Sequence, residues 1–216
     1  AFVPVWEFDL RVAEATLQKI AAEIEIKPQD AGLRIVGARL EATPGQPGRA
    51  LDLRPTLTVL AHNPWAVVSS GRLTLEIAPV EPAIGDVGPA MAKAGPWLAA
   101  PVILNLYDAI QDEKLSWSIA PEVLASWIKI GPAKDAPAQL DCTVEPAGVE
   151  AYLQAQMAEL GAERYLEVKE AAPAVIAAMT GTERAARARI YHRPRRHTVK
   201  AGETLSSIAL DYGMPY

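Results

Sequence analysis

The residues that could carry out acid–base, nucleophilic or metal chemistry are three histidines, one cysteine and a scattered set of carboxylates. The histidines, His62, His192 and His197, are not spaced as metal ligands, and each is expected to be structural or solvated. Cys142 lacks the neighbours of a nucleophile and is expected to be a small buried apolar residue. Glycoside hydrolysis needs two carboxylates at a defined separation, which spacing along the chain does not show. The carboxylates in question are Asp108, Asp112, Glu113, Asp135 and Asp141. The pattern predicts no catalytic residue, no metal site and no cofactor.

Aromatic side chains are the next candidates, because an indole ring can stack on the apolar face of a sugar. Each tryptophan lies in or beside an apolar pattern, so packing in a core is the expected role. The tryptophans are Trp6, Trp65, Trp97, Trp117 and Trp127.

A basic run without any acidic residue lies near the end of the chain, although the net charge of the chain is −5. Its members are Arg184, Arg187, Arg189, Arg193, Arg195, Arg196 and Lys200. The exposed face of a strand, followed by a solvated linker, is the expected role. Contact with an anionic polymer, such as wall carboxylates and phosphates, is the alternative. Nucleic acid is disfavoured, because only Tyr191 is interleaved and no nucleic-acid motif accompanies the run.

The tetrapeptide Gly202-Glu203-Thr204-Leu205 combines a turn residue with a helix start. Glycine tolerates positive φ, and the hydroxyl oxygen of Thr204 can cap the first turn of a helix. Apolar residues then recur with helical spacing. The segment predicts a short strand at residues 197–199, a turn at Gly202 and a helix after Thr204.

This stretch resembles the opening half of a lysin motif (LysM), a small βααβ module that binds N-acetylglucosamine-containing glycans. The matching pieces are His197-Thr198-Val199, Gly202-Glu203-Thr204-Leu205, Ile208-Ala209 and Tyr212-Gly213. The resemblance implies a ligand groove in which backbone amides hold the N-acetyl group. It implies that Gly202, Glu203, Thr204 and Leu205 line one side of the groove, with Met214 near the other.

The preceding residues predict mixed helical and extended structure in two parts that meet near Gly85. At 216 residues the chain is long enough for two small domains, and its longest apolar patch, residues 97–106, is too short to cross a bilayer. In the first part we expect a strand at 3–8, a helix at 10–24 capped by Asp9, strands at 31–35 and 37–42, a helix at 55–62 and a half-buried strand at 72–77. In the second part we expect a helix at 89–99, a hairpin of strands at 102–107 and 114–119, helices opened by Pro121 and Pro146, a strand at 140–144, a helix at 171–179 and a strand at 186–190.

The end of the second part repeats a stretch of the first. Arg164–Lys169 has the pattern of Arg49–Arg54, and Ala186–Ile190 has that of Leu73–Ile77, with a helix between them in both copies. The later copy lacks the equivalent of residues 31–48. Repeats of this kind indicate duplicated supersecondary units.

These parts resemble the peptidoglycan-binding α+β domain that occurs in tandem before the catalytic domains of some L,D-transpeptidases and in vancomycin-resistance W-type wall proteins. The residues that carry the resemblance are Trp117–Leu124, the helix at Tyr152-Leu153, Pro47–Asp52 and the strand that closes with Pro79–Pro82. The resemblance implies an α+β protein of two related small mixed domains, with antiparallel strands packed on helices, followed by the βα start of a LysM. The expected ranges are 1–85, 86–194 and 195–216.

Together the two resemblances imply a non-catalytic module that binds peptidoglycan or a related N-acetylglucosamine glycan. They place it outside the cytoplasm, at the cell wall or cell surface. Nucleic acid is not expected as a partner, and membrane contact is expected only through an N-terminal anchor outside this chain. One alternative is the targeting portion of a wall hydrolase or L,D-transpeptidase whose catalytic domain lies beyond residue 216. Another is a spacer or scaffold that binds protein partners.

Overall fold

The computed structural model describes residues 8–194 and 196–213, and it shows an α+β protein, as predicted. The chain forms two compact units. The first contains the residues up to Gly32, together with Ala42–Val87 and Ala136–Gln139. The second contains Leu33–Glu41, Gly88–Asp135 and the chain from Leu140 onward. The strand predicted at residues 3–8 falls almost wholly on residues 1–7, which lie outside the described part.

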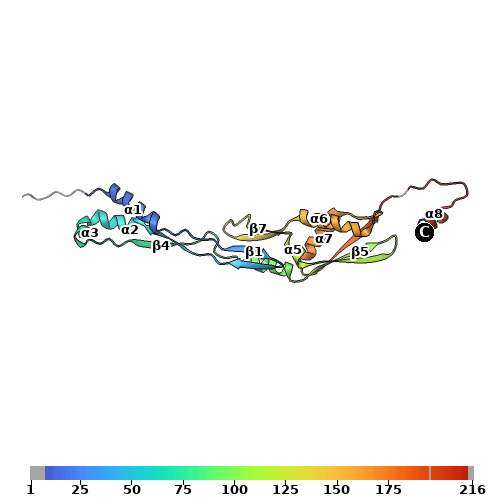
Figure 1. Cartoon of the computed structure of the whole chain (residues 1–216), viewed down its shortest axis with the longest axis horizontal. Helices are drawn as coiled ribbons and strands as arrows, with labels where there is room; N and C mark the ends of the chain where they lie inside the picture. Colours follow the sequence, from blue (N-terminus) through green and yellow to red (C-terminus); the bar gives the residue numbers. More distant parts are fainter. Residues whose placement is uncertain (1–7, 195, 214–216) are drawn as a thin grey trace, which may run out of the picture. The chain divides into compact units, whose positions relative to one another are not determined.

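The first unit packs helices beside a two-stranded antiparallel ladder of β3 and β4. Its elements are α1 (Leu10–Ile24), β3 (Gly48–Asp52), α2 (Leu53–His62), α3 (Pro64–Ser70) and β4 (Glu76–Val80). Helix α1 begins where predicted, because Oδ1 of Asp9 accepts a hydrogen bond from the N–H of Arg11 at 2.8 Å. Helices α1 and α2 lie side by side (Figure 1). The small core of this unit includes Leu17, Leu51 and Leu60.

The first unit differs from the prediction in one helix boundary and in one additional helix. Helix α2 begins at Leu53 rather than Pro55, because Oδ1 of Asp52 accepts from the N–H of Arg54 at 3.1 Å and caps the helix earlier. Asn63 ends α2 as predicted, but its side chain also caps the unpredicted helix α3. The same residue therefore stops one helix and starts the next.

The strand predicted at residues 72–77 forms four residues later, as β4, and includes Pro79. Pro79 pairs with Arg49, whose backbone exchanges hydrogen bonds of 2.9 and 2.8 Å with Ile26 on the opposite side. Arg49 therefore needs no N–H from Pro79. Since the ladder has only two strands, the proline nitrogen faces an unpaired edge, where proline is tolerated.

The two strands predicted before the Pro/Gly turn form a hairpin of β1 (Gly32–Val36) and β2 (Arg39–Thr43). Its apolar residues Leu33, Ile35 and Leu40 pack against the core of the second unit. Most of the hairpin therefore belongs to the second unit, although it follows α1 in the chain.

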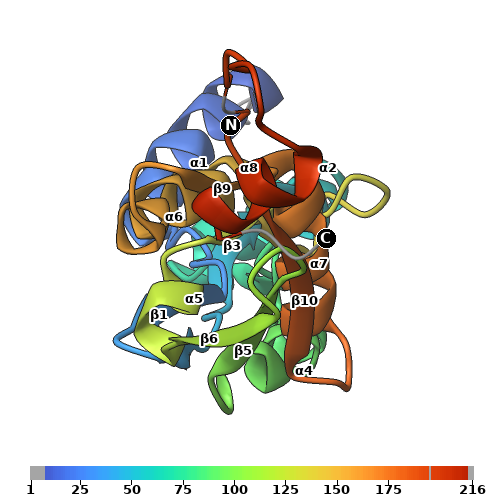
Figure 2. The same cartoon turned by 90° about the vertical axis from the view of Figure 1, so that its right-hand side faces the viewer.

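The second unit is built on a four-stranded sheet in the order β6-β5-β10-β9. Figure 2 shows β6, β5 and β10 side by side. The β5–β6 pair forms the predicted antiparallel hairpin. The β9–β10 pair is also antiparallel, whereas β5 and β10 are parallel. Helix α7 packs on this sheet and against α6. The sheet and its helix consist of β5 (Val102–Asp108), β6 (Glu113–Ile119), β9 (Arg164–Leu166), α7 (Val168–Thr180) and β10 (Ala185–His192). The other elements are α4 (Gly88–Ala94), the 3₁₀ turns η1 (Gly95–Leu98) and η2 (Met157–Leu160), α5 (Pro121–Ala125), β7 (Ile128–Pro132), β8 (Leu140–Val144), α6 (Pro146–Gln156) and α8 (Leu205–Asp211).

The core of the second unit contains most of the residues for which packing was predicted. Cys142, Trp97 and Trp127 are buried, and Trp117 packs against the core from its edge. Trp65, in α3 of the first unit, is an exception, because 58% of its surface is exposed. The fifth tryptophan, Trp6, lies outside the described residues.

The predicted repeat is confirmed by the arrangement β3-α2-β4 and β9-α7-β10. Leu51 pairs with Ile77 in one copy, and Leu166 pairs with Ile190 in the other. At the first position of each copy, the Nε–H of an arginine donates to a carbonyl at the end of the preceding helical segment. Arg49 donates to Ile24 at 3.0 Å, and Arg164 donates to Leu160 at 2.9 Å.

Within residues 8–194 and 196–213, no helix has both the length and the apolar character that a membrane span requires.

Candidate glycan-binding site

The predicted ligand segment forms a tight turn that leads into helix α8. Gly202 has φ of 95°, and the N–H of Glu203 donates to the carbonyl of Lys200 at 3.1 Å. A side chain at Gly202 would be strained, because L-residues rarely adopt this φ. The predicted corner at Gly202 is therefore present.

Helix α8 begins after Thr204, as predicted, and it is fixed by a reciprocal capping box. The hydroxyl oxygen of Thr204 accepts from the N–H of Ser207 at 3.2 Å, and the Ser207 hydroxyl oxygen accepts from the N–H of Thr204 at 2.9 Å. Ser207 takes the position that Glu or Gln usually fills in this motif. The cap determines the direction in which the helix leaves the turn.

The carboxylate of Glu203 stabilises the turn through two hydrogen bonds. Its Oε2 accepts from the N–H of Lys200 at 2.7 Å and lies 2.8 Å from Nε2 of His197. Nδ1 of His197 lies 3.2 Å from the hydroxyl of Tyr212, and the two rings meet edge to face. The hydrogen bond with His197, followed by that from Lys200, holds the pKa of Glu203 below its ordinary value. His197 thus links Glu203 to Tyr212 and closes the segment, a link that the sequence did not predict.

The apolar residues of this segment are largely uncovered. Leu205 is 86% exposed, and Val199 and Leu210 are also exposed. The strand predicted at residues 197–199 is wrong, because none of the described strands pairs with this irregular segment. Met214, the fifth predicted contact residue, lies outside the described residues.

The basic run divides into residues with different roles. Arg184 was predicted to be solvated, but its guanidinium bonds to the protein instead. It donates to the carbonyls of Met179 at 2.7 Å and Trp97 at 2.8 Å, and to that of Ala100. Burial lowers the pKa of this guanidinium. Arg187 and Arg189, by contrast, are exposed on β10, as expected for the wet face of a strand.

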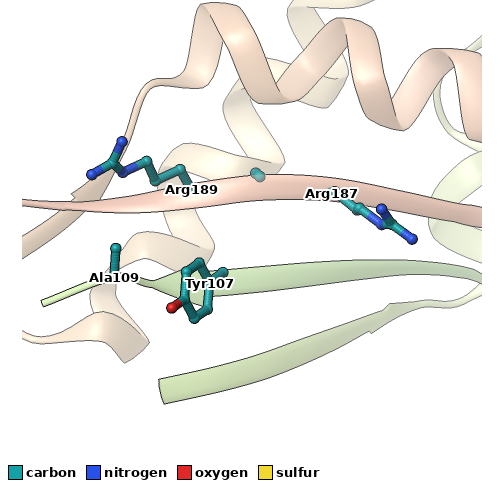
Figure 3. Close-up of a pocket in the computed structure, with 5 residues that line it drawn as sticks. Tyr107, Ala109, Arg187 and Arg189 are labelled. Atoms are coloured by element: carbon teal, nitrogen blue, oxygen red, sulfur yellow. The ribbon is translucent and has the colours of Figure 1, made fainter. Parts of the chain in front are cut away.

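Arg187 and Arg189 lie next to Tyr107 on β5 and line an open groove of about 350 Å³ (Figure 3). The guanidinium carbon of Arg189 lies 5.5 Å from the centroid of the Tyr191 ring, a cation–π distance. The Tyr107 hydroxyl donates to Asp112 at 2.9 Å, and this bond raises the pKa of the phenol. Neither the groove nor its tyrosine was predicted from the sequence.

A charged cluster of Asp108, Glu113, Arg164 and His192 takes one residue from each strand of the four-stranded sheet. Nε2 of His192 lies 2.8 Å from Oδ2 of Asp108. Nη1 of Arg164 lies 2.6 Å from Glu113 and 3.6 Å from Asp108. Asp108 is fully buried, and its Oδ1 accepts from two backbone N–H groups of the following loop at 3.0 and 3.1 Å. The cluster ties four strands together at one end of the sheet.

The surroundings of Asp108 in the charged cluster favour its ionised form. Burial alone would raise the pKa of Asp108, but the hydrogen bonds from His192 and the two backbone N–H groups outweigh it and hold the pKa below its ordinary value. A catalytic general acid needs the opposite shift. Glu113 and Asp108 also share Arg164 as an ion-pair partner. Of the other candidate carboxylates, Asp141 pairs with Lys93 at 2.6 Å and Asp135 is exposed in a loop.

Among the described residues, no group of three or more histidine, cysteine, aspartate or glutamate side chains is placed to hold a metal ion. His62 bonds through Nδ1 to the carbonyl of Thr58 at 2.9 Å, within its own helix. His192 and His197 each pair with a single carboxylate. The three histidines therefore lie in three separate settings, each with its own local partner.

Comparison with known protein families gives two matches. Residues 1–63 match the family described as "Putative peptidoglycan binding domain", and residues 197–216 match the LysM domain. No curated protein and no solved structure matches the chain. The two matches support a module that binds peptidoglycan or another N-acetylglucosamine-containing glycan of the cell wall. Both matching families are binding domains.

Proposed function

We propose that this chain is a non-catalytic module that fixes itself, or a domain joined to it, on peptidoglycan outside the cytoplasm. In this proposal Gly202, Glu203, Thr204, Leu205 and Met214 contact an N-acetylglucosamine glycan. The observation that carries it is the corner at Gly202 followed by a capped helix, within the residues that match LysM. A rigid turn presents its backbone and side chains to a ligand at little entropic cost.

The proposal also assigns both units to the wall-binding family. The family match covers residues 1–63. The second unit is included because it shares the strand–helix–strand repeat, with its paired Leu–Ile positions and its arginine at the strand start. Along the sequence the proposed domain ranges are 1–85, 86–194 and 195–216, with Leu33–Glu41 of the first range packed in the second unit.

Co-sedimentation with purified peptidoglycan sacculi tests the proposal. We expect the full chain to sediment with sacculi and a version without residues 195–216 to sediment less. Insoluble cellulose, which lacks N-acetyl groups, serves as the control matrix. If the full chain sediments no better with sacculi than with cellulose, the proposal is wrong.

A second candidate function, docking of a protein partner, is favoured by one observation. Trp65 and Val68 lie three residues apart on α3 and are 58% and 60% exposed. Side chains at this spacing share one helix face, and exposed tryptophan is typical of interface hot spots. Loss of a protein partner in the Trp65→Ala variant, with sedimentation on sacculi unchanged, would support this function.

A further inference from the structure

One face of the four-stranded sheet in the second unit carries a group of polar and basic side chains. In the register of the sheet, Arg187 lies beside Asn105 and Arg189 lies beside Tyr107. Paired residues of neighbouring strands point to the same side, so these four residues share a face, which we call the arginine face. All four are exposed.

The opposite face of the same strands forms the core. Leu104, Leu106, Ala186 and Ile190 alternate with the residues of the arginine face and are buried. The alternation fixes Arg187 and Arg189 on the solvent side, because a shift of one residue would place both charges in the core. The arginine face is therefore held by the packing of the whole sheet.

The two arginines are spaced and positioned to bind a ligand. Residues two apart on a strand are about 7 Å apart, and Figure 3 shows the two side chains extending along β10 to either side of the Tyr107 ring. They line the groove of about 350 Å³ together with Tyr107, Ala109 and Ala188. The Tyr191 ring, 5.5 Å away, helps to position Arg189.

The guanidinium groups of the arginine face have unused donors. In the described part of the chain, no carboxylate lies within 4.0 Å of Arg187 or Arg189. Glu167 and Glu170 line a second, smaller pocket beside the two arginines, and two of the nearby carboxylates are engaged by tyrosines. Asp112 accepts from Tyr107 at 2.9 Å, and Glu170 accepts from Tyr191 at 3.1 Å. A planar guanidinium with free N–H groups is well suited to bind a carboxylate with two parallel hydrogen bonds.

We infer that the arginine face binds carboxylate groups of the peptidoglycan strand through Arg187 and Arg189, with the ring of Tyr107 against a neighbouring sugar. The inference rests on the proposed function and adds a second contact, separate from Gly202–Leu205. The sugar and the acid explain why an aromatic ring and two arginines share one groove. Phosphate polymers without bases or a nucleic-acid duplex would use the arginines without a need for Tyr107.

Calorimetric titration of the full chain with two soluble probes tests the inference. The first probe is a GlcNAc–MurNAc tripeptide, which carries carboxylates, and the second is chitotetraose, which carries none. In the R187A/R189A variant we expect affinity for the first probe to fall at least tenfold and affinity for chitotetraose to stay unchanged. The R187K/R189K variant keeps the positive charges but lacks the paired N–H groups of a guanidinium, so it should lose affinity to a smaller degree. The matched control is R39A/R72A, which removes the same charge from exposed positions elsewhere and should bind like the parent.

The outcomes separate this inference from the proposed function. If the parent chain binds chitotetraose but both arginine variants keep full affinity for the muropeptide, the inference alone is wrong. If the parent binds neither probe nor sacculi, the proposed function fails as well. Equal losses for both probes overturn the specific role of the arginines. Arginine-dependent sedimentation that disappears when phosphate polymers are stripped from sacculi overturns it too, as does arginine-dependent binding to a short DNA duplex without binding to the muropeptide.

Discussion

Asp108 on β5 contacts His192 on β10 and Arg164 on β9, and so it links three strands of the sheet in the second unit. Because its pKa in the folded state lies below the unfolded value of about 3.9, its stabilising effect is complete above that pH. The effect is lost as pH falls through the lowered folded pKa. We expect Asp108→Asn to lower the free energy of unfolding at pH 7 by about 2 kcal/mol, since the charge-assisted hydrogen bond with His192 is weakened and the ion pair with Arg164 is lost.

Urea unfolding measured by circular dichroism from pH 2 to pH 7 checks this prediction. The variant should also show a flatter dependence of stability on pH below about pH 4. Asp135→Asn, at an exposed loop position, is the control and should unfold like the parent. Equal unfolding curves for Asp108→Asn and the parent would show that the charged cluster contributes nothing.

Cys142 is fully buried on β8, and burial, followed by the charge of Asp141, raises the pKa of its thiol. Since the thiolate is the reactive form, we expect no reaction of the native protein with a thiol reagent at pH 8. One thiol per chain should react in denaturing urea, as measured by the absorbance of the released chromophore. Rapid reaction of the native protein would contradict the burial of β8.

Glu203 gives the terminal turn a pH dependence of its own. Its lowered pKa means that the hydrogen bond from the N–H of Lys200 is kept above about pH 4.3, the ordinary value for glutamate, and is lost as pH falls through the lowered folded value. We expect Glu203→Gln to speed exchange of the Lys200 amide proton, measured by NMR. The Val199 amide serves as the internal reference, and unchanged exchange at Lys200 would show that Glu203 does not brace the turn.

At the scale of the elements, the ladder of β3 and β4 depends on a close backbone approach at Gly48. A Cβ added there would meet the carbonyl oxygen of Ile26 and come within 2.5 Å of the nitrogen of Pro28. Backbone atoms cannot move aside as a flexible side chain can, so we expect Gly48→Ala to destabilise the first unit by about 1–3 kcal/mol. Thermal unfolding followed by circular dichroism measures the effect.

Gly85 provides the matched control for this substitution. A Cβ there would meet nothing within 4 Å, and its φ is not in the left-handed region. Gly85→Ala should therefore change stability by no more than about 0.5 kcal/mol. If both alanine variants unfold alike, the close approach of β3 to the segment around Ile26 is not a constraint on the fold.

At the scale of the whole molecule, two separate contacts with one polymer should give avidity. Linked weak sites can raise affinity by roughly 10²-fold or more when both engage the same polymer. We expect removal of residues 195–216 and the R187A/R189A substitution each to speed dissociation from sacculi, and the combination to abolish retention. The rates are measured by washing loaded sacculi. On a soluble chitotetraose probe, which engages one contact, the R187A/R189A substitution should have no effect.

Local signals explain how much of the fold could be predicted. Asp9 and Thr204 cap helices through hydrogen bonds to backbone groups two or three residues away, so the sequence determines where α1 and α8 begin. The β5–β6 hairpin follows from two alternating runs joined by a short polar loop. The strand–helix–strand repeat was visible because both copies keep the same residue pattern. The corner at Gly202, and with it the candidate ligand segment, was predictable because a glycine and a capping threonine are both local signals.

Tertiary structure alone decided the features that join distant residues. His192 and Asp108 are 84 positions apart, and the parallel pairing of β5 with β10 brings them together. The same pairing places Tyr107 beside Arg189 and so creates the groove. The partial burial of Arg184 and the exposure of Leu205 depend on which other parts of the chain pack against these side chains. A side chain's type and spacing determine its local hydrogen bonds, but its burial and charge partners depend on where the whole chain folds.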